Sequence, residues 1–425
     1  MAEIKPFSPL RFNADNTAIR TLVSPPYDIV SPSERAELLV KNAHNIIRVE
    51  LPEGDGEAKY AAAAKAYGEY VDSGVLVHDK TPGLFVYSEE FSVGGKEYTV
   101  YGVIGRVTLH EFSERIILPH EETLTKAKQD RFELMKATCA NISPIYALYS
   151  DASGITDTIL KKAMEQTPLY RFTDDDGIAH SLFKIEAGSF TDEFARVLAD
   201  KQLFIADGHH RYETALRYKH HLEQQHSLDG TAADSQMILL VEMDNPGLVV
   251  FPTHRLIKAP VKLTSEGIIA KAKEYFEIAA VSGDAVQALE GCGDAAGCYI
   301  FCAKDGKYLL RLRDDSVMQK LLPGKSEAYA TLDVTILHTL ILEGILGIDR
   351  EDMALGKSLA YTRDMNEALE APYNGGGEMS FILNATKVSQ IKDVSLAGEK
   401  MPQKSTYFYP KPVTGLVIND LKSLQ

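Results

Sequence analysis

The segment from Asp207 to Arg211 concentrates the groups that an anion-binding site needs. Gly208 lets the backbone approach a ligand closely, and Arg211 can donate two parallel, charge-assisted hydrogen bonds to a phosphate. His209 and His210 can donate hydrogen bonds or transfer protons near neutral pH. Asp207 can cap a helix or hold a metal ion beside the anion. The pattern predicts a site for phosphate or another anion.

This segment lies between a strand-like and a helix-like run. Residues 203–206 are apolar and predict a short buried strand, and residues from 209 to about 225 have amphipathic helical spacing. A strand that turns through glycine into a helix presents backbone N–H groups at the turn, where the helix dipole also favours negative charge. The alternative is a plain turn in which Asp207 only caps the helix. A metal site at the two adjacent histidines is disfavoured, because neighbouring helix positions point about 100° apart.

Two other segments carry groups suited to a substrate. Two prolines hold Tyr27 and Asp28 on a stiff loop. His254 and Arg255 follow an apolar run, and sites on open sheets often form at strand ends. A structural salt bridge is the alternative interpretation of the His254–Arg255 pair.

The C-terminal segment places two cations and two hydroxyls around three aromatic residues. These groups are Lys404, Ser405, Thr406 and Lys411. Such a set suits phosphate or carboxylate binding. Alternatively, the aromatic residues pack into the core while the lysines stay in water.

A short acidic loop, His120-Glu121-Glu122, precedes an expected helix at 126–140. Exposed charges are common on protein surfaces, so a merely solvated loop is the alternative to a catalytic role.

Composition restricts the class of protein. The chain has 425 residues, a formal net charge of −15 and four cysteines without a disulfide or zinc pattern. The acidic balance argues against nucleic acid as a partner, and no apolar run reaches the length of a membrane span. We expect a cytoplasmic protein with a small-molecule substrate, no membrane partner, and a homodimer as an open alternative.

The overall pattern predicts a mixed α/β (α+β) fold with no internal repeats. We expect an N-terminal α+β region at 1–110, a phosphate-binding core at 111–258 and a C-terminal α+β region at 259–425 that returns to the site. Other expected elements are a capping box at 31–34, a strand at 45–51, a hairpin around 94–95 and a long apolar helix at 331–345.

The chain resembles domain-of-unknown-function family 1015, whose members are sometimes labelled SpoOJ/ParB-like. The segments that carry this resemblance are 25–28, 119–121, 206–211, 253–255 and 401–406. The Asp-Gly-His-His-Arg turn after a buried strand also resembles the phosphate-binding turn of the ParB/sulfiredoxin superfamily, in the version found in free L-serine kinases. This resemblance implies a ParB/sulfiredoxin-like core with N-terminal and C-terminal α/β elaborations.

The resemblance to free L-serine kinases implies the role of Glu121, and the chemistry of the residues in the motif segments suggests the other roles. Glu121 would be the catalytic base, with Asp207 and His209 beside it in catalysis and Asp207 as a Mg²⁺ ligand. Nucleotide or phosphate would bind at Gly208, His209, His210, Arg211, Lys404, Ser405 and Thr406. Substrate would bind at Tyr27, Asp28, His120, His254 and Arg255.

The leading hypothesis is therefore a nucleotide-dependent phosphotransferase that uses ATP, ADP or another nucleotide with Mg²⁺. Its acceptor would be a small hydroxylated metabolite, with free L-serine, converted to phosphoserine, as the best candidate. A phosphatase of a small phosphometabolite is one alternative. A non-enzymatic, ParB-like nucleotide-binding regulator is another, although no basic recognition helix is evident.

Overall fold

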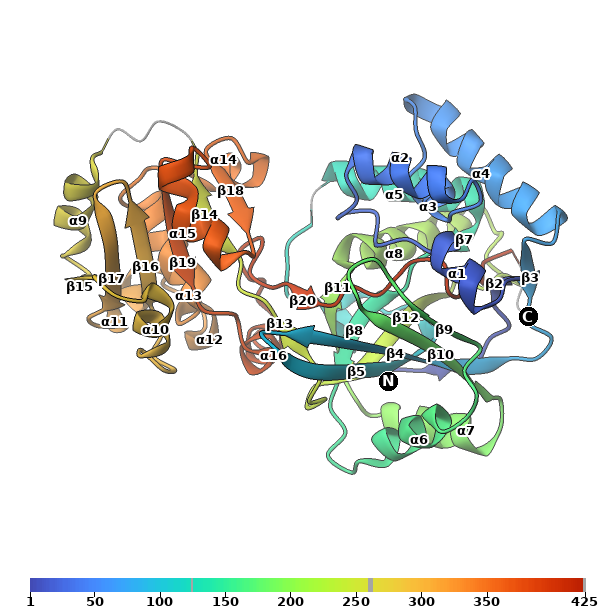
Figure 1. Cartoon of the computed structure of the whole chain (residues 1–425). Helices are drawn as coiled ribbons and strands as arrows, with labels where there is room; N and C mark the ends of the chain where they lie inside the picture. Colours follow the sequence, from blue (N-terminus) through green and yellow to red (C-terminus); the bar gives the residue numbers. More distant parts are fainter. Residues whose placement is uncertain (124, 259–262, 423–425) are drawn as a thin grey trace. The chain divides into compact units, whose positions relative to one another are not determined.

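A computed structural model describes residues 1–123, 125–258 and 263–422. The contacts within the chain group it into two compact units, shown in Figure 1. Unit 1 contains Met1–Pro119, Thr123–Leu248 and Pro410–Gln425, and unit 2 contains His120–Glu122 and Val249–Tyr409. Both units mix helices and strands, which confirms the predicted α/β class. The three-region division stays a prediction.

Unit 1 is built on a nine-stranded mixed sheet with the order β6-β11-β8-β12-β5-β4-β10-β9, and β1 pairs with β5. The β11–β6 and β12–β8 pairs are parallel and the other pairs are antiparallel. The sheet strands are β1 (Ile4–Lys5), β4 (Gly83–Val93), β5 (Lys96–Thr108), β6 (Ile117–Leu118), β8 (Ile145–Tyr149), β9 (Tyr170–Thr173), β10 (Ala179–Glu186), β11 (Leu203–Asp207) and β12 (Ser235–Glu242).

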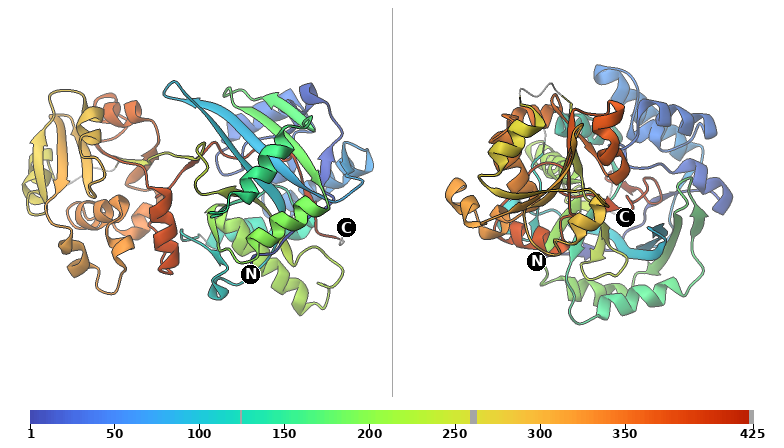
Figure 2. Two further views of the ribbon diagram at one scale, coloured as in Figure 1. Left: turned by 90° about the horizontal axis from the view of Figure 1, so that it is seen from below. Right: turned by 60° about the vertical axis from the view of Figure 1, so that its left-hand side comes forward.

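Helices cover the sheet of unit 1 on both faces. The helices of this unit are α1 (Asn16–Leu22), α2 (Pro32–Lys41), α3 (Ile47–Glu50), α4 (Gly56–Asp72), the 3₁₀ turn η1 (Phe112–Glu114), α5 (Thr125–Thr138), α6 (Ile155–Met164), α7 (Ser189–Leu198) and α8 (His209–Gln224). Figure 1 shows α5 and α8 above the sheet and α6 and α7 below it, and the view from below in Figure 2 brings α6 and α7 to the front. Short ladders pair β2 (Leu10–Phe12) with β3 (Leu76–His78) and β7 (Ala140–Asn141) with β21 (Asn419–Asp420).

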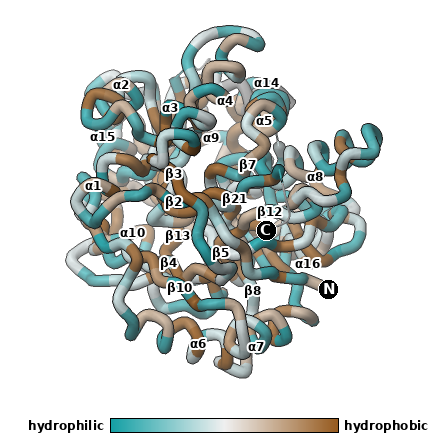
Figure 3. Tube along the Cα trace, turned by 90° about the vertical axis from the view of Figure 1, so that its right-hand side faces the viewer, coloured by the Kyte–Doolittle hydropathy of each residue, from teal (hydrophilic) through white to brown (hydrophobic). Residues whose placement is uncertain are grey.

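The hydrophobic core of unit 1 lies between this sheet and its helices. Figure 3 shows that α8 is largely hydrophilic along its length. Tyr212, Ala215, Leu216 and Tyr218 are residues of α8 that enter this core. This buried face fixes which side chains of the first helical turn face the interior.

Unit 2 is built on a six-stranded antiparallel sheet with the order β15-β17-β16-β19-β14-β18. Its strands are β14 (His254–Ile257), β15 (Phe276–Ala280), β16 (Cys298–Ala303), β17 (Gly306–Leu312), β18 (Leu359–Thr362) and β19 (Met379–Leu383), and a separate ladder pairs β13 (Val249–Val250) with β20 (Phe408–Tyr409). The helices are α9 (Ser265–Ala272), α10 (Ala285–Glu290), α11 (Ser316–Leu321), α12 (Glu327–Ala330), α13 (Asp333–Ile336), the π-helix η2 (Leu337–Glu343), α14 (Arg350–Leu355), α15 (Met365–Asn374) and α16 (Val388–Leu396).

Alternating side chains of the central strand β16 enter two different cores. Tyr299 and Phe301 pack with residues of α9, α13 and η2, whereas Ile300 and Cys302 pack with residues of α10 and α15. This period of two is expected of a strand that is buried on both faces.

Two elements and one helix cap differ from the sequence-based expectation. The expected strand at 45–51 is the short helix α3, because the Asn45 side chain accepts a hydrogen bond from the Ile47 N–H (2.9 Å) and starts a helical turn. The expected long helix at 331–345 is present as the contiguous elements α13 and η2, but η2 has π geometry. Asp207 does not cap α8, because it is the last residue of β11 and Gly208 is the N-cap.

Other expectations are confirmed. Ser31 and Glu34 form the predicted capping box of α2. The hairpin joins β4 to β5 through Gly94 and Gly95. The strand and the helix on either side of Gly208 are β11 and α8.

Candidate functional site

The turn between β11 and α8 has the geometry that a backbone anion site requires. Gly208 has a φ of +90°, in the left-handed region that glycine adopts without strain. The Tyr212 N–H donates to the Gly208 carbonyl (3.0 Å), which begins a helix of 16 residues. Because Gly208 is the N-cap, no capping side chain extends from that position over the first turn.

Two cations meet the carboxylate of Asp207. Arg211 Nη2 donates to Asp207 Oδ2 (2.7 Å), and Lys411 Nζ donates to Asp207 Oδ1. The side chains of Asp207, Arg211 and Lys411 are only 17%, 10% and 8% exposed. Burial alone would raise the pKa of Asp207, but Lys411 and Arg211 outweigh it and hold the pKa well below its usual range. The turn therefore carries an ionised carboxylate with two buried cations beside it.

Arg211 is also held by the backbone. Its Nη1 donates to the Pro144 carbonyl (2.6 Å), so the guanidinium has fixed partners on two sides. His209 is 5% exposed, and its charge contributes to the low pKa of Asp207. His210 follows it in the first turn of α8 and is half-buried.

A second charged cluster in unit 1 is linked electrostatically to Arg211. The Arg131 guanidinium lies 4.0 Å from the centre of the Tyr27 ring, and its Nη1 donates to the Glu50 carbonyl (2.8 Å). Burial raises the pKa of Tyr27 to about 12, against the opposing charges of Arg131 and Arg211, and Asp28 acts in the same direction as burial. The predicted Tyr27–Asp28 loop thus lies within reach of the Arg211 charge.

Arg131 and Glu50 complete this cluster but were not identified from the sequence. A cavity of about 30 Å³ lies next to them and to Arg211. This volume corresponds to about two water molecules, so the cavity is too small for a metabolite.

The arrangement at Asp207 does not fit direct coordination of Mg²⁺. Both carboxylate oxygens already accept from cationic donors, Lys411 and Arg211. Among the described residues, no group of three or more histidine, cysteine, aspartate or glutamate side chains is arranged to hold a metal ion.

In unit 2, the structure brings His120 and Glu121 against the segment 401–406. Met401 N–H donates to the His120 carbonyl (2.7 Å), and His120 Nε2 lies 3.0 Å from Thr406 Oγ1. The Lys404 N–H points to Glu121 Oε1 at 3.5 Å. His120 is 1% exposed, so the interpretation of this residue as part of a solvated loop is wrong.

The hydroxyl of Ser405 has a structural partner. Ser405 Oγ donates to the Pro402 carbonyl (2.5 Å), and Thr386 Oγ1 donates to the Ser405 carbonyl (2.8 Å). Lys404 is exposed and has a φ of +57°. The expected C-terminal cation set is therefore divided, with Lys404 in unit 2 and Lys411 at the Asp207 turn of unit 1.

His254 and Arg255 are both buried in β14 of unit 2 and are 0% exposed. Arg255 donates to the carbonyls of Thr253 and Lys404 (3.1 Å to the latter), and its Nη2 lies 3.3 Å from His338 Nε2. Within the described ranges, no carboxylate lies within salt-bridge distance of Arg255. The alternative interpretation of this pair as a salt bridge is therefore wrong.

Burial dominates the ionisation of both residues. It lowers the pKa of Arg255 to about 10 and the pKa of His254 to about 4. The Leu383 N–H points to His254 Nδ1 at 3.4 Å. His254 is thus neutral near pH 7 and does not supply a cation for an anionic ligand.

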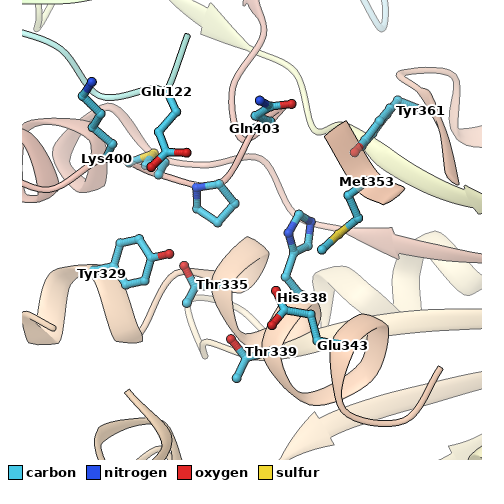
Figure 4. A pocket seen from close by; sticks show the side chains of 12 residues that line it. Glu122, Tyr329, Thr335, His338, Thr339, Glu343, Met353, Tyr361, Lys400 and Gln403 are labelled. Carbon is cyan, nitrogen blue, oxygen red and sulfur yellow. The ribbon is translucent and has the colours of Figure 1, made fainter. Parts of the chain in front are cut away.

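A cavity of about 140 Å³ lies near Arg255 in unit 2. Its walls are drawn in Figure 4 and carry four hydroxyls, an imidazole, two carboxylates and an ammonium group. These groups belong to Tyr329, Thr335, Thr339, Tyr361, His338, Glu122, Glu343 and Lys400. A signal for part of this set is visible in the sequence, because His338, Thr339 and Glu343 interrupt an otherwise apolar helical run.

Comparisons with known proteins place the chain in a family. A family model described as "Protein of unknown function (DUF1015)" matches residues 4–335, which is more than half of the chain. The chain belongs to the DUF1015 family. The comparison with curated proteins gave no match.

Several solved structures are similar to this DUF1015 protein at a low level. Free serine kinase in complex with AMP is 15% identical, with a TM-score of 0.36, over 72% of this chain and 88% of that one. A conserved hypothetical protein from Pyrococcus furiosus is 12% identical, with a TM-score of 0.33, over 69% and 87%. SbnI with a C-terminal truncation, from Staphylococcus aureus, is 10% identical, with a TM-score of 0.37, over 74% and 87%. Similarity at this level supports no functional assignment.

The predicted site residues of the DUF1015 protein form two groups, one in each unit. Unit 1 holds Tyr27, Asp28 and the turn 207–211, joined by Lys411. Unit 2 holds His120, Glu121, the segment 404–406 and the His254–Arg255 pair. In the described part of the chain, none of the helices is both long and apolar enough to cross a membrane.

Proposed function

We propose that this protein is a nucleotide-dependent phosphotransferase whose acceptor is a small hydroxylated metabolite. The observation that carries the proposal is the Gly208 turn, where β11 enters a helix of 16 residues and two buried cations meet Asp207. The resemblance of residues 207–211 to the phosphate-binding turn of the ParB/sulfiredoxin superfamily supports it. Free L-serine is the best candidate acceptor on the same resemblance.

The Gly208 turn supplies what a nucleotide phosphate needs. Backbone N–H groups of the first helical turn and the helix dipole attract the phosphate, and the lack of a side chain at Gly208 leaves room for the Arg211 guanidinium beside them. Arg211 and Lys411 bring two positive charges against the single charge of Asp207, so the side chains at the turn are net cationic. Asp207 acts here as a positioning residue, because it holds Arg211 and Lys411 in fixed places.

Phosphoryl transfer relies on positioning and electrostatic stabilisation more than on covalent chemistry by the protein. Mg²⁺ would enter this reaction with the phosphates of the nucleotide and retained waters, since Asp207 is already bound to two cations. The charge of His209 acts on Asp207 in the same direction as Lys411 and Arg211, so this residue adds to the positive potential at the turn.

Glu121 is proposed as the base that accepts the proton of the acceptor hydroxyl. Its role comes from the resemblance, and its position in unit 2 supports it. The charge of Glu121 raises the pKa of Tyr361, a wall residue of the unit 2 cavity, and the next residue, Glu122, lines the same cavity. The proposed base thus lies beside a space of metabolite size.

The decisive experiment measures nucleotide binding by isothermal titration calorimetry with ATP, ADP and pyrophosphate in Mg²⁺ buffer. We expect Lys411→Met to weaken ATP binding about tenfold, because it removes one of the two cations at the turn. Lys422→Met is the matched control, since Lys422 is an exposed lysine of the same C-terminal segment. Wild-type protein that binds none of the three ligands would overturn the proposal, and so would a Lys411→Met variant that binds ATP as tightly as Lys422→Met.

Turnover tests the proposed base separately. We expect Glu121→Gln to abolish phosphoryl transfer to the acceptor while ATP binding stays at the wild-type level. Glu290→Gln, at an exposed position of unit 2, is the control. Loss of nucleotide binding together with turnover would contradict the role of Glu121 as base.

A further inference from the structure

The cavity of unit 2 carries a buried polar group that lacks a partner. Thr335 is 1% exposed and lines the cavity, and its Oγ1 finds no hydrogen-bond partner among the described residues. A buried hydroxyl without a partner costs free energy, and a ligand in the cavity that bonds to it would remove that cost. Thr335 therefore points to a polar occupant.

A π-helix arranges the polar groups on one wall of the same cavity. The Gly344 N–H donates to the Thr339 carbonyl (3.2 Å), an i to i+5 hydrogen bond that widens the turn. His338 and Glu343 are also five residues apart in η2, and both line the cavity. Figure 4 shows the Glu343 carboxylate on the same wall as the imidazole of His338. Such π segments often occur at functional sites.

The imidazole of His338 connects the cavity to the buried charge of Arg255. A guanidinium has no acceptor atom, so His338 Nε2, at 3.3 Å, must accept from Arg255 Nη2. The Tyr361 ring, another cavity wall, lies 5.3 Å from the Arg255 guanidinium carbon. Arg255 thus places a positive charge, unpaired with any carboxylate in the described ranges, directly behind two residues of the wall.

Both signs of charge therefore act on one small space. Glu122 and Glu343 contribute two carboxylates, and Lys400 together with the Arg255 charge behind His338 contributes two positive groups. A simple anion would meet the two glutamates, and a simple cation would meet the Arg255 charge. A molecule that carries one charge of each sign satisfies both sets.

We propose that this cavity binds a small zwitterion of the α-amino acid class, with its carboxylate on the side of His338 and Arg255 and its ammonium group at Glu343. The Thr335 hydroxyl provides a further hydrogen bond to the ligand. The volume of about 140 Å³ suits such a ligand, because a cavity of about 150 Å³ accommodates a molecule as large as benzene. Binding itself does not require the phosphotransferase activity. The role of this ligand as the phosphoryl acceptor rests on the proposed function.

The test is calorimetric titration of the full chain with glycine, L-alanine, L-serine and L-threonine. The tightest of these is then compared with two analogues, glycerate, which lacks the ammonium group, and ethanolamine, which lacks the carboxylate. We expect both analogues to bind at least tenfold more weakly than the amino acid. Equal binding of either analogue, or no binding of any of the four amino acids at millimolar concentrations, would overturn the proposal.

Substitutions of cavity residues test whether the amino acid binds in this cavity. We expect Glu343→Gln to weaken amino-acid binding at least tenfold but not glycerate binding, because only the amino acid presents an ammonium group to residue 343. Thr335→Val removes the unpaired hydroxyl at nearly constant volume, and we expect weaker binding of both ligands. Glu290→Gln is the control, and amino-acid binding by either cavity variant at the level of this control would overturn the proposal.

ATP titrations of the same variants separate the two proposals. Nucleotide binding at the wild-type level with lost amino-acid binding supports the cavity assignment. Amino-acid binding that persists in a protein without nucleotide binding would refute only the phosphotransferase.

Discussion

Two arginines with similar burial have opposite electrostatic surroundings. Arg211 in unit 1 has the Asp207 carboxylate at 2.7 Å and the Pro144 carbonyl at 2.6 Å. Arg255 in unit 2 has two carbonyls and a neutral imidazole nitrogen as acceptors, and no carboxylate among the described residues. Arg211 has a carboxylate partner within the fold, which it shares with Lys411, whereas Arg255 has none among the described residues.

This difference separates a guanidinium held by an ion pair from a buried guanidinium without a carboxylate partner. A buried ion pair is costly to break, because the remaining charge then lies unpaired in a medium of low dielectric constant. A buried cation without a carboxylate partner has this free-energy cost already in the native state. A fold tolerates the cost when a bound ligand or contact with solvent offsets it. We therefore interpret Arg211 as preorganised by its ion pair. Arg255, in contrast, lacks a carboxylate partner among the described residues.

The largest expected difference is in the free energy of unfolding, between a variant that removes the carboxylate partner of Arg211 and a variant that removes the charge of Arg255. Asp207→Asn leaves Arg211 and Lys411 buried without an anion, so we expect the free energy of unfolding to fall by about 3–5 kcal/mol. Arg255→Met removes a charge that no carboxylate balances, and we expect a loss below about 2 kcal/mol, from the hydrogen bonds to its acceptor groups. Urea denaturation of the two variants and the wild type measures both changes.

Hydrogen exchange assigns each change to its unit. We expect the lost protection in Asp207→Asn to lie in β11 and α8. If Arg255→Met destabilises the protein as strongly as Asp207→Asn, then Arg255 is compensated in solution and the contrast between the two arginines fails.

The pH dependence of stability gives a second contrast between the units. In unit 1, burial raises the pKa of Glu89 to about 7, above its value of about 4.3 in an unfolded chain. Between these values the native state binds more protons than the unfolded state, so stability falls as the pH rises from about 4.3 to 7. The charges that face Glu89 are those of His180 and Asp174, with the Tyr87 hydroxyl as its hydrogen-bond donor.

In unit 2, the pKa of His254 changes stability in the opposite direction. Burial lowers it to about 4, below the unfolded value of about 6.5. The unfolded state then binds more protons across this window, so the contribution of His254 is lost as the pH falls from 6.5 towards 4. Each effect amounts to roughly 1 kcal/mol per pH unit within its window.

Urea midpoints at pH 5.0, 6.0 and 7.5 measure these two slopes. We expect Glu89→Gln to reduce the loss at pH 7.5 and His254→Gln to reduce the loss at pH 5.0. Two variants whose midpoints follow the wild-type pH profile would show that neither residue titrates as its burial implies.

The sequence predicted the β11–turn–α8 arrangement because the information is local. An apolar run, an Asp-Gly pair and an amphipathic period each act within a few residues. The helix cap was misassigned because Asp207 is drawn into β11 and pairs with Lys411, 204 residues further along the chain. That pairing depends on tertiary structure, which no local pattern contains.

The same limit applied to the cavity and to the charged cluster of unit 1. Glu50 lies in α3, which was expected to be a strand, so its contact with Arg131 could not be anticipated. Thr335 and Glu343 lie in a run that resembles an ordinary buried helix, and only the folded chain shows that its second part has π geometry and that both residues line the cavity. Arg255 was predicted to bind substrate, but its burial and its lack of a carboxylate partner among the described residues follow only from the packed sheet.

The smallest expected effect tests whether a side chain at position 208 only strains the backbone or also displaces the Arg211 guanidinium. Gly208 and Gly154 are both left-handed N-caps, with φ of +90° and +68°, of α8 and α6. Alanine at either position costs about 1 kcal/mol in backbone strain. At Gly154 an added Cβ meets no described atom within 4 Å, whereas at Gly208 it lies 3.0 Å from Arg211 Nε and Nη2. We therefore expect Gly208→Ala to exceed Gly154→Ala by several tenths of a kcal/mol in urea denaturation and to be the only one of the two that weakens ATP binding. Equal effects in both measurements would show that Gly208 acts only as a turn glycine and that its closeness to Arg211 does not affect ATP binding.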